Sequence, residues 1–170
     1  MTSLGQTLTQ SRLLVMCGSG GVGKTTTSAA LALTAALQGR RVVVLTIDPA
    51  QRLLQALGLH GLQHPANEPL EVLPRLSDLL PEPMAGGSLH AVMLDAQSAS
   101  VSMIERLLPD PSVRDRVLGN RVYRAFLPAL AASPDYMALE LIGKLQREGR
   151  FDLLVLDTPP MHNALDFLRA

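Results

Sequence analysis

A glycine-rich segment between an apolar run and an Ala- and Leu-rich stretch carries residue types that bind phosphate. Residues 18–25 read GSGGVGKT. Because glycine has no Cβ, successive backbone N–H groups of such a turn can point at one anion, and Lys24 and Thr25 add a mobile charge and a hydroxyl for magnesium. The spacing predicts a loop that cradles the phosphates of ATP or GTP. The residues expected to contact the nucleotide are Gly18, Ser19, Gly20, Gly21, Val22, Gly23, Lys24, Thr25 and Thr26.

Two aspartates follow apolar runs and are candidates for the remaining chemistry. Asp157 ends the run FDLLVL, where a carboxylate can hold magnesium directly or through water, although Asp-Thr-Pro is also common in turns. Asp48 follows VVVLTI and could orient or deprotonate an attacking water, bind the metal through water, or cap a helix. We expect Asp157 to be a metal ligand, and Asp48 to act in catalysis with Lys24 and to assist the metal. Asp95, at a third such position, fits a structural helix cap.

The elements that must position these residues alternate between strand and helix, which predicts an α/β fold with a mainly parallel sheet. In such sheets ligands bind beyond the carboxyl ends of the strands, where the glycine-rich loop and the aspartates would gather. Residues 60–87 contain five prolines and are expected to form a loop with at most one short strand. The last helix has Ser133 as its expected cap and Gly149 as its stop. The expected strands are 12–16, 41–47, 89–94 and 151–156, and the expected helices are 24–38, 51–57, 102–108, 113–130 and 134–147.

The composition excludes several classes of protein. The chain has 170 residues, 47% of them apolar, which suits one domain. Its 15 basic and 15 acidic residues balance, and only 3% of residues are aromatic, so nucleic acid is not an expected partner. Cys17 is the only cysteine, which excludes an intrachain disulfide and fits a reducing compartment. The chain begins without a signal-peptide pattern, and its longest mostly apolar stretch, 28–37, is too short to span a bilayer. We therefore expect a cytoplasmic protein.

Three motifs in the same order resemble those of the ArsA/Get3 family of anion-transporting and tail-anchored-protein-targeting ATPases, and of its actinobacterial ArsA-like branch in particular. They are GSGGVGKTTT at 18–27, DPA at 48–50 after the VVVLTI run, and DTPP at 157–160 ahead of NAL at 163–165. The resemblance covers almost the whole chain from Leu13. Three ordered motifs make it more specific than an isolated glycine-rich loop.

The resemblance implies a three-layer P-loop NTPase domain of the SIMIBI type over residues 1–170, with a helical insertion at about 97–148. It also implies a magnesium-dependent ATPase. Lys24 would contact the phosphates of ATP, Thr25 and Asp157 would attend Mg²⁺, Asp48 in a first switch would orient the hydrolytic water, and a second switch would begin at Asp157. Nucleotide state would control a cargo, either an anion or a protein, and the chain would pair with itself or with a related ATPase subunit.

The chain departs from the family pattern in three places. Ser19 stands where the family carries a signature lysine, which in dimeric members reaches toward the partner's nucleotide. Residues 161–163 read MHN, where targeting members place a glycine and a histidine. The chain also stops at Ala170, where family members normally continue through further strands, so an N-terminal fragment or truncated product is expected.

These departures keep two other functions open. One is a nucleotide-binding regulatory subunit that hydrolyses its nucleotide poorly and acts through a partner. Ser19, in place of the signature lysine, suggests this alternative. The other is a positioning ATPase of the ParA/MinD type, which shares the fold. The sequence lacks the basic DNA-binding surface and the C-terminal amphipathic membrane helix expected of that type, so we rank it last.

Overall fold

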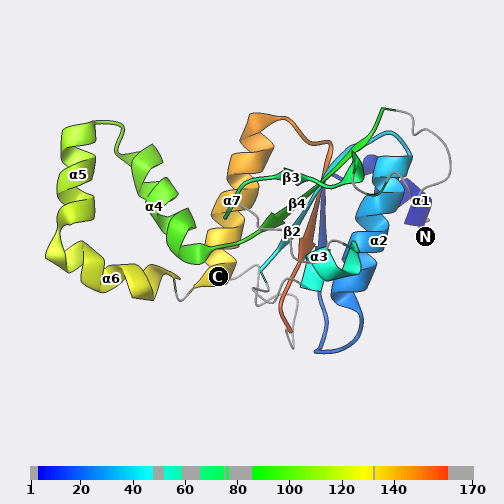
Figure 1. Ribbon diagram of the computed structural model, residues 1–170, viewed down its shortest axis with the longest axis horizontal. Helices are drawn as coiled ribbons and strands as arrows, with labels where there is room; N and C mark the ends of the chain where they lie inside the picture. The colour runs from blue at the N-terminus through cyan, green and yellow to red at the C-terminus, as the bar shows by residue number, and fades with distance from the viewer. Residues whose placement is uncertain are drawn as a thin grey trace.

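A five-stranded sheet with the order β1-β5-β2-β4-β3 forms the centre of the molecule (Figure 1). The structure is a computed structural model that describes residues 4–47, 52–58, 66–74, 76, 86–131 and 133–160. β1, β5, β2 and β4 are parallel, and β3 is antiparallel to β4. The predicted mainly parallel α/β sheet is therefore confirmed. The strands are β1 (Leu13–Met16), β2 (Arg41–Thr46), β3 (Leu70–Glu71), β4 (Ser88–Met93) and β5 (Leu153–Asp157).

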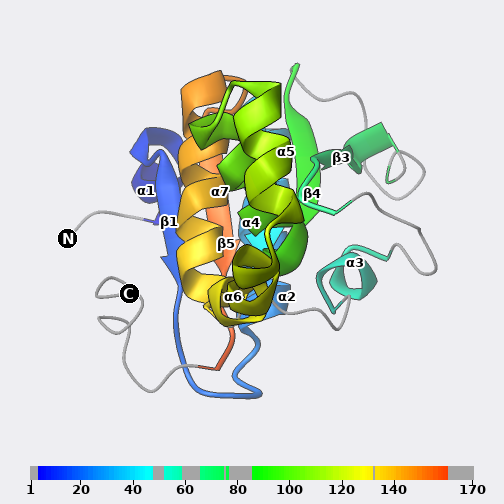
Figure 2. The ribbon, with the colours of Figure 1, turned by 90° about the vertical axis from the view of Figure 1, so that its left-hand side faces the viewer.

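Helices cover both faces of this sheet and give it three layers (Figures 1 and 2). On one face lie α1 (Leu4–Gln10), α2 (Lys24–Leu37) and α3 (Arg52–Ala56). On the other face lie α7 (Pro134–Glu148) and the beginning of α4 (Ala96–Leu107). Each predicted strand and helix has a counterpart here, apart from the differences described below.

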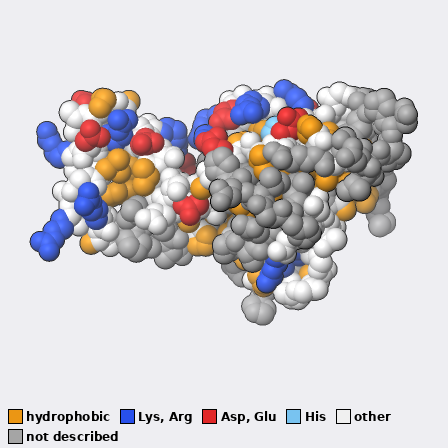
Figure 3. Space-filling model, viewed as in Figure 1, with side chains coloured by type: hydrophobic (Ala, Val, Ile, Leu, Met, Phe, Trp, Pro, Cys, Tyr) orange, Lys and Arg blue, Asp and Glu red, His pale blue; other side chains and the backbone are white. Residues whose placement is uncertain are grey.

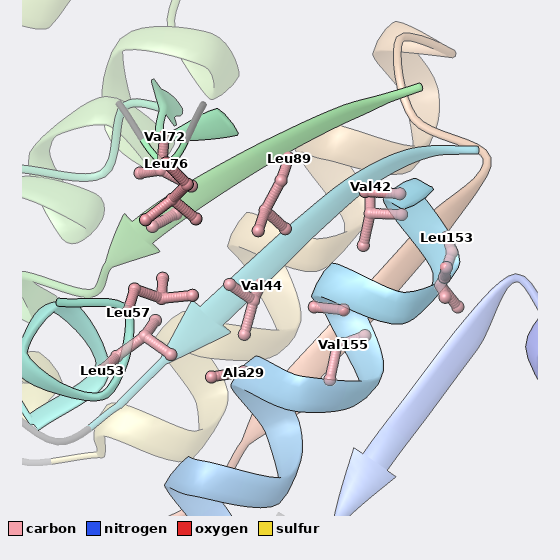
Figure 4. Packing of buried hydrophobic residues seen from close by; sticks show 14 of the residues in the cluster. Ala29, Val42, Val44, Leu53, Leu57, Val72, Leu76, Leu89, Leu153 and Val155 are labelled. Atoms are coloured by element: carbon pink, nitrogen blue, oxygen red, sulfur yellow. The ribbon is translucent and has the colours of Figure 1, made fainter. Parts of the chain in front are cut away.

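The continuous apolar run of β2 follows from burial on both faces. Val42 and Val44 point into the core beneath α2, whereas Val43 and Leu45 point into the core beneath α7, and all four are at most 1% exposed. Figure 4 shows Val44 beside Ala29 of α2, and Val42 farther along the strand, near the other end of that helix. A strand that faces water on one side would alternate apolar and polar residues, but a central strand of a covered parallel sheet has no polar face.

Small residues let α2 lie close to the sheet. Its inward positions are alanines and a serine, and Ala32, Ala35 and Ala36 are fully buried. The approach is tight near the C-terminal end of α2, where a Cβ added to Gly87, just before β4, would lie 2.0 Å from the carbonyl oxygen of Ala36. Because α2 begins directly after the glycine-rich loop, this packing also fixes the loop against the sheet.

α4 leads into an arm formed with α5 (Pro111–Gly119) and α6 (Arg121–Ala131), which extends away from the sheet (Figure 1). The prediction of one helix over residues 113–130 is wrong. Asn120 is extended, and its side-chain oxygen accepts a hydrogen bond from the backbone N–H of Val122 at 2.7 Å, so it ends α5 and caps α6.

α4 also begins earlier than the predicted start at residue 102. The carboxylate of Asp95 accepts a hydrogen bond from the backbone N–H of Ser98 at 2.6 Å, which places the cap directly before Ala96. The interpretation of Asp95 as a structural cap is thus confirmed. A capping carboxylate also suits the positive end of the helix dipole.

α7 matches its prediction except at its cap. Met137, Leu141 and Leu145 form its buried face, and Gly149 ends it in the left-handed conformation with φ of 64°. The hydroxyl of Ser133 makes no capping hydrogen bond, although its backbone carbonyl accepts one from Met137 at 3.2 Å. The carbonyl alone therefore serves the first turn, and the prediction of a side-chain cap is wrong.

α1 has no counterpart among the predicted helices. Leu8 is its one buried residue, so it presents no apolar periodicity. The guanidinium of Arg40 joins α1 to the sheet, because it donates to the backbone carbonyls of Leu8, Ser11 and Asp152. Across the described parts of the chain, no helix is both long and apolar enough to cross a membrane.

Replacing Gly87 by Ala should destabilise the protein strongly, because the new methyl group would overlap the backbone of α2. The overlap is with backbone and not with a flexible side chain, so relieving it requires α2 or the chain at Gly87 to shift. We expect the free energy of unfolding to fall by at least about 2 kcal/mol in urea denaturation. Gly119→Ala is the matched control, since a Cβ there meets nothing within 4 Å. It should change stability by less than about 1 kcal/mol, in the stabilising direction. Equal effects of the two substitutions would contradict the close approach.

Candidate functional site

The glycine-rich loop joins the carboxyl end of β1 to the first turn of α2. Gly23 occupies the position just before α2 with φ of 84°, a left-handed conformation that a residue with a Cβ adopts only with strain. Its carbonyl accepts the hydrogen bond from Thr27 that starts the helix, at 2.9 Å. The loop therefore delivers the chain to a helix N-terminus, where unpaired N–H groups and the helix dipole favour an anion.

Lys24 folds back over the loop. Its Nζ donates to the backbone carbonyls of Gly18 and Ser19, each at 2.9 Å. These two bonds hold the ammonium group above the loop, where it also lines the pocket described below. An ammonium on a flexible stem can exchange backbone carbonyls for phosphate oxygens, since both are hydrogen-bond acceptors.

A buried carboxylate lies directly beneath the first turn of α2. Asp157 is 1% exposed. Its Oδ2 accepts hydrogen bonds from the hydroxyls of Thr25 at 2.7 Å and Thr46 at 3.3 Å, and its Oδ1 accepts one from Ser28 at 3.5 Å. Three hydroxyls from two different elements therefore hold this one carboxylate in place.

The strand order explains how these residues meet. β5 lies between β1 and β2, and its register aligns Asp157 with Met16 on one side and Thr46 on the other. The hydroxyl of Thr158 then donates to the backbone carbonyl of Met16 at 2.6 Å. The end of β5 is thus joined both to the strand that leads into the glycine-rich loop and to the helix that follows it.

Burial raises the pKa of the Asp157 carboxyl above its ordinary value, because the charged form loses its hydration. The hydrogen bonds from Thr25 and Thr46, the nearby charge of Lys24 and the hydroxyl of Ser28 act in the opposite direction without cancelling it. A buried carboxylate whose charge is only partly compensated favours a cation beside it. The site is therefore electrostatically suited to a metal ion.

The donor set fits magnesium in particular. Thr25 and Asp157 supply a hydroxyl and a carboxylate, both hard oxygen ligands, within 2.7 Å of one another. Within the residues that the structure describes, no group of three or more His, Cys, Asp or Glu side chains could hold a metal ion. Magnesium needs no such cage, since it is commonly held by one or two protein oxygens together with phosphates and water.

A pocket of about 230 Å³ opens above the loop. Its charged lining side chains, among the described residues, are Lys24 and Arg52, and both are basic. The opposite wall comes from the segment that follows Asp157, where Pro160 lies within 3.8 Å of a Cβ built on Gly20. The pocket can therefore take an anionic ligand. Its lining residues are Gly20, Gly21, Gly23, Lys24, Thr25, Thr26, Arg52, Thr158, Pro159 and Pro160.

The structure brings most of the predicted site residues to this place. Lys24, Thr25 and Thr26 line the pocket, and Asp157 lies beneath it. Val22 is 60% exposed and does not line the pocket. Asp48 lies outside the described residues, and its catalytic and metal roles remain predictions.

Sequence reasoning missed four residues of the site. Thr46 and Ser28 bind Asp157, Thr158 joins β5 to β1, and Arg52 lines the pocket. Thr46 lies two residues before Asp48, at the end of a strand, and that position is a usable signal. Ser28 is one turn beyond Lys24 on the same helix, so helical spacing could have identified it.

Comparisons with known proteins agree with this geometry. The model of the family described as anion-transporting ATPase matches residues 11–170. An uncharacterized protein of Streptomyces coelicolor is 32% identical over 160 residues, covering 94% of this chain and 37% of that protein. The arsenical pump-driving ATPase of Escherichia coli is 29% identical, covering 92% of this chain and 25% of its own length. ATPase ASNA1 homolog 1 of Paramecium tetraurelia is 27% identical, covering 89% of this chain and 41% of that protein. The chain spans less than half the length of these relatives.

Asp157→Asn should make the protein more stable at neutral pH. With a raised pKa, folded Asp157 holds its proton more tightly than the unfolded chain does, so the folded state binds more protons in the range just above the ordinary carboxyl pKa. Wild-type stability therefore falls as pH rises through that range, and the amide removes this fall. We expect a gain of about 1 kcal/mol in the free energy of unfolding at pH 7, typical of replacing a destabilising functional group.

Asp95→Ala serves as the opposite case. Hydrogen bonds from Ser98 lower the pKa of Asp95, so its charge supports the folded state. Removing this cap should lower the free energy of unfolding by about 1 kcal/mol at pH 7. Thermal or urea melts at pH 4 to 8 measure this variant, Asp157→Asn and the wild type together. A loss of stability in Asp157→Asn as large as that in Asp95→Ala would show that the charge of Asp157 is already compensated.

Proposed function

This chain belongs to the anion-transporting ATPase family, and from that premise we propose that it binds ATP with Mg²⁺ and hydrolyses it to ADP and phosphate. The observation that supports the proposal most is the 2.7 Å hydrogen bond between Thr25 and Asp157. It joins the residue after the P-loop lysine to the acidic end of a distant strand, the pair that P-loop enzymes use at their magnesium ion.

Binding would rest on the loop and the first turn of α2. Backbone N–H groups of residues 20–25 would donate to the phosphate oxygens, and Lys24 would turn from the carbonyls of Gly18 and Ser19 to the β and γ phosphates. Thr25 and Asp157 would hold the metal. When bound, Mg²⁺ would supply positive charge that offsets the negative charge developing on the phosphate oxygens during transfer.

Hydrolysis would be a matter of position and electrostatics. A water oxygen attacks the γ phosphorus, the bond from that phosphorus to the β–γ bridging oxygen breaks, and ADP leaves with the electron pair. Lys24 favours this step by attracting the oxygens on which charge accumulates. We assign the orientation of the water to Asp48, on the basis of the sequence motif alone.

We further propose that the nucleotide controls a cargo. Residues 158–160 line the pocket and continue directly from Asp157. Loss of the γ phosphate would therefore change the surroundings of this segment directly. The helical arm offers surface for a cargo, because Leu107, Val122 and Phe126 are each more than half exposed. Figure 3 shows hydrophobic side chains among basic ones on this arm. The cargo would be an anion or a protein, handled by a homodimer or by a pair with a related ATPase subunit.

Steady-state release of phosphate from MgATP tests the proposal. Lys24→Ala should lower turnover about a hundred- to a thousandfold, because it removes one electrostatic donor from the transition state. Lys144 is the only other lysine. It lies on α7, paired with Glu68 at 3.4 Å, so Lys144→Ala controls for the loss of a lysine and should leave turnover unchanged.

The outcomes separate the candidate functions. Turnover that is lost in Lys24→Ala but kept in Lys144→Ala supports an ATPase. Binding of MgATP by the wild-type chain without turnover would favour the nucleotide-binding regulatory subunit. Failure to bind MgATP at all would refute the proposal.

A further inference from the structure

We propose that Arg52, at the start of α3, binds the terminal phosphate of the nucleotide in the pocket above the glycine-rich loop. The inference rests on the proposed function and goes beyond the loop and the aspartates, since Arg52 belongs to none of the three motifs. Its basis is the position of one basic side chain in a pocket whose described charged lining consists of it and Lys24.

The packing of α3 fixes where Arg52 stands. Leu53, Leu54 and Leu57 are at most 6% exposed and belong to the core that α2 forms with the sheet. Figure 4 shows Leu53 and Leu57 directed toward this core. Arg52, at the start of the same short helix, is exposed and lines the pocket. The buried leucines therefore hold the backbone of α3 in place, so that Arg52 reaches the ligand from a fixed base.

The charge of the pocket calls for a second cation. ATP bound with one Mg²⁺ retains a net negative charge, which is greatest at the terminal phosphate. Lys24 is a single point charge, whereas a guanidinium presents a planar fork of donors that matches two oxygens of one phosphate. Arg52 and Lys24 lie on different segments of the pocket wall, so they can approach different oxygens of one phosphate group.

The terminal phosphate is favoured over the inner ones by the topology. α3 follows β2, whose last residue, Thr46, lies 3.3 Å from the carboxylate oxygen of Asp157 that also accepts from Thr25. Thr25 and Asp157 would hold the metal, whose charge would offset part of the negative charge of the phosphates. Arg52 belongs to α3 and not to the loop or to α2. Because the loop and the N-terminus of α2 supply the donors for the inner phosphates, the oxygens of the terminal phosphate are the ones left for Arg52.

Matched variants of the full chain test this assignment. Arg52→Gln removes the charge, Arg52→Lys keeps it without the fork, and Arg121→Gln is the control. Arg121 is likewise exposed and first in its helix, but it lies on the arm. Calorimetric titration should measure dissociation constants for Mg-ADP and for the magnesium complex of adenylyl imidodiphosphate, a non-hydrolysable ATP analogue. Phosphate release gives kcat and KM.

In Arg52→Gln we expect binding of the triphosphate analogue to weaken roughly ten- to a hundredfold, the effect of losing a charge-assisted hydrogen bond, with ADP binding unchanged. The ratio of kcat to KM should fall by at least as much. Arg52→Lys should recover part of both losses, and Arg121→Gln should match the wild type. Preserved ADP binding would show that the variant is folded.

Three results would overturn the assignment. Unchanged analogue binding and turnover in Arg52→Gln, with turnover still abolished in Lys24→Ala, would refute the role of Arg52 and leave the ATPase intact. Equal weakening of ADP and analogue would place Arg52 at the inner phosphates instead. Failure of the wild-type chain to bind either nucleotide would refute the proposed function and this assignment with it.

Discussion

The hydrogen bond between Thr25 and Asp157 is the contact on which the rest of the site depends. It joins two residues 132 positions apart in the chain, and it forms only because β5 lies between β1 and β2. With β5 in that place, the first turn of α2 and the end of β2 both contact the Asp157 carboxylate, and the end of β1 pairs with β5 at the same point. A sheet in which β5 did not pair with β1 would separate the loop from its acidic partner.

Burial of the Asp157 carboxylate has a cost that the fold only partly offsets. Hydroxyls of Thr25, Thr46 and Ser28 bind it, yet burial still raises its pKa. Structures commonly keep such uncompensated charge where function needs it, because a fully neutralised carboxylate would have little affinity for a cation. The same low-dielectric setting that makes Asp157 costly would strengthen its attraction for a bound metal.

The two faces of the sheet support different parts of the molecule. The face beneath α2 and α3 is packed with alanines and leucines so closely that Gly87 has no room for a Cβ. That rigidity fixes both the loop and the base of Arg52. The face beneath α7 anchors α4, from which the arm extends away from the sheet. One face thus positions the pocket, and the other supports exposed surface.

The sequence by itself determined the local features: the loop, the buried strands, the stop at Gly149 and the cap at Asp95. Each depends on neighbouring residues, so periodicity, glycine and capping patterns report it. Patterning failed where local signals were weak or competing, as at Asn120, which divides a long helical stretch, and in α1, which buries a single leucine.

Only the tertiary structure decided the strand order, and with it the partners of Asp157 and the presence of Arg52 in the pocket. Thr46 and Arg52 look like ordinary strand-end and helix-start residues in the sequence. Their importance comes from long-range pairing of β2 with β5 and from the packing of α3 on α2. A motif specifies which groups are available, whereas the sheet order specifies which of them meet, because contacts between distant segments leave no local pattern in the chain.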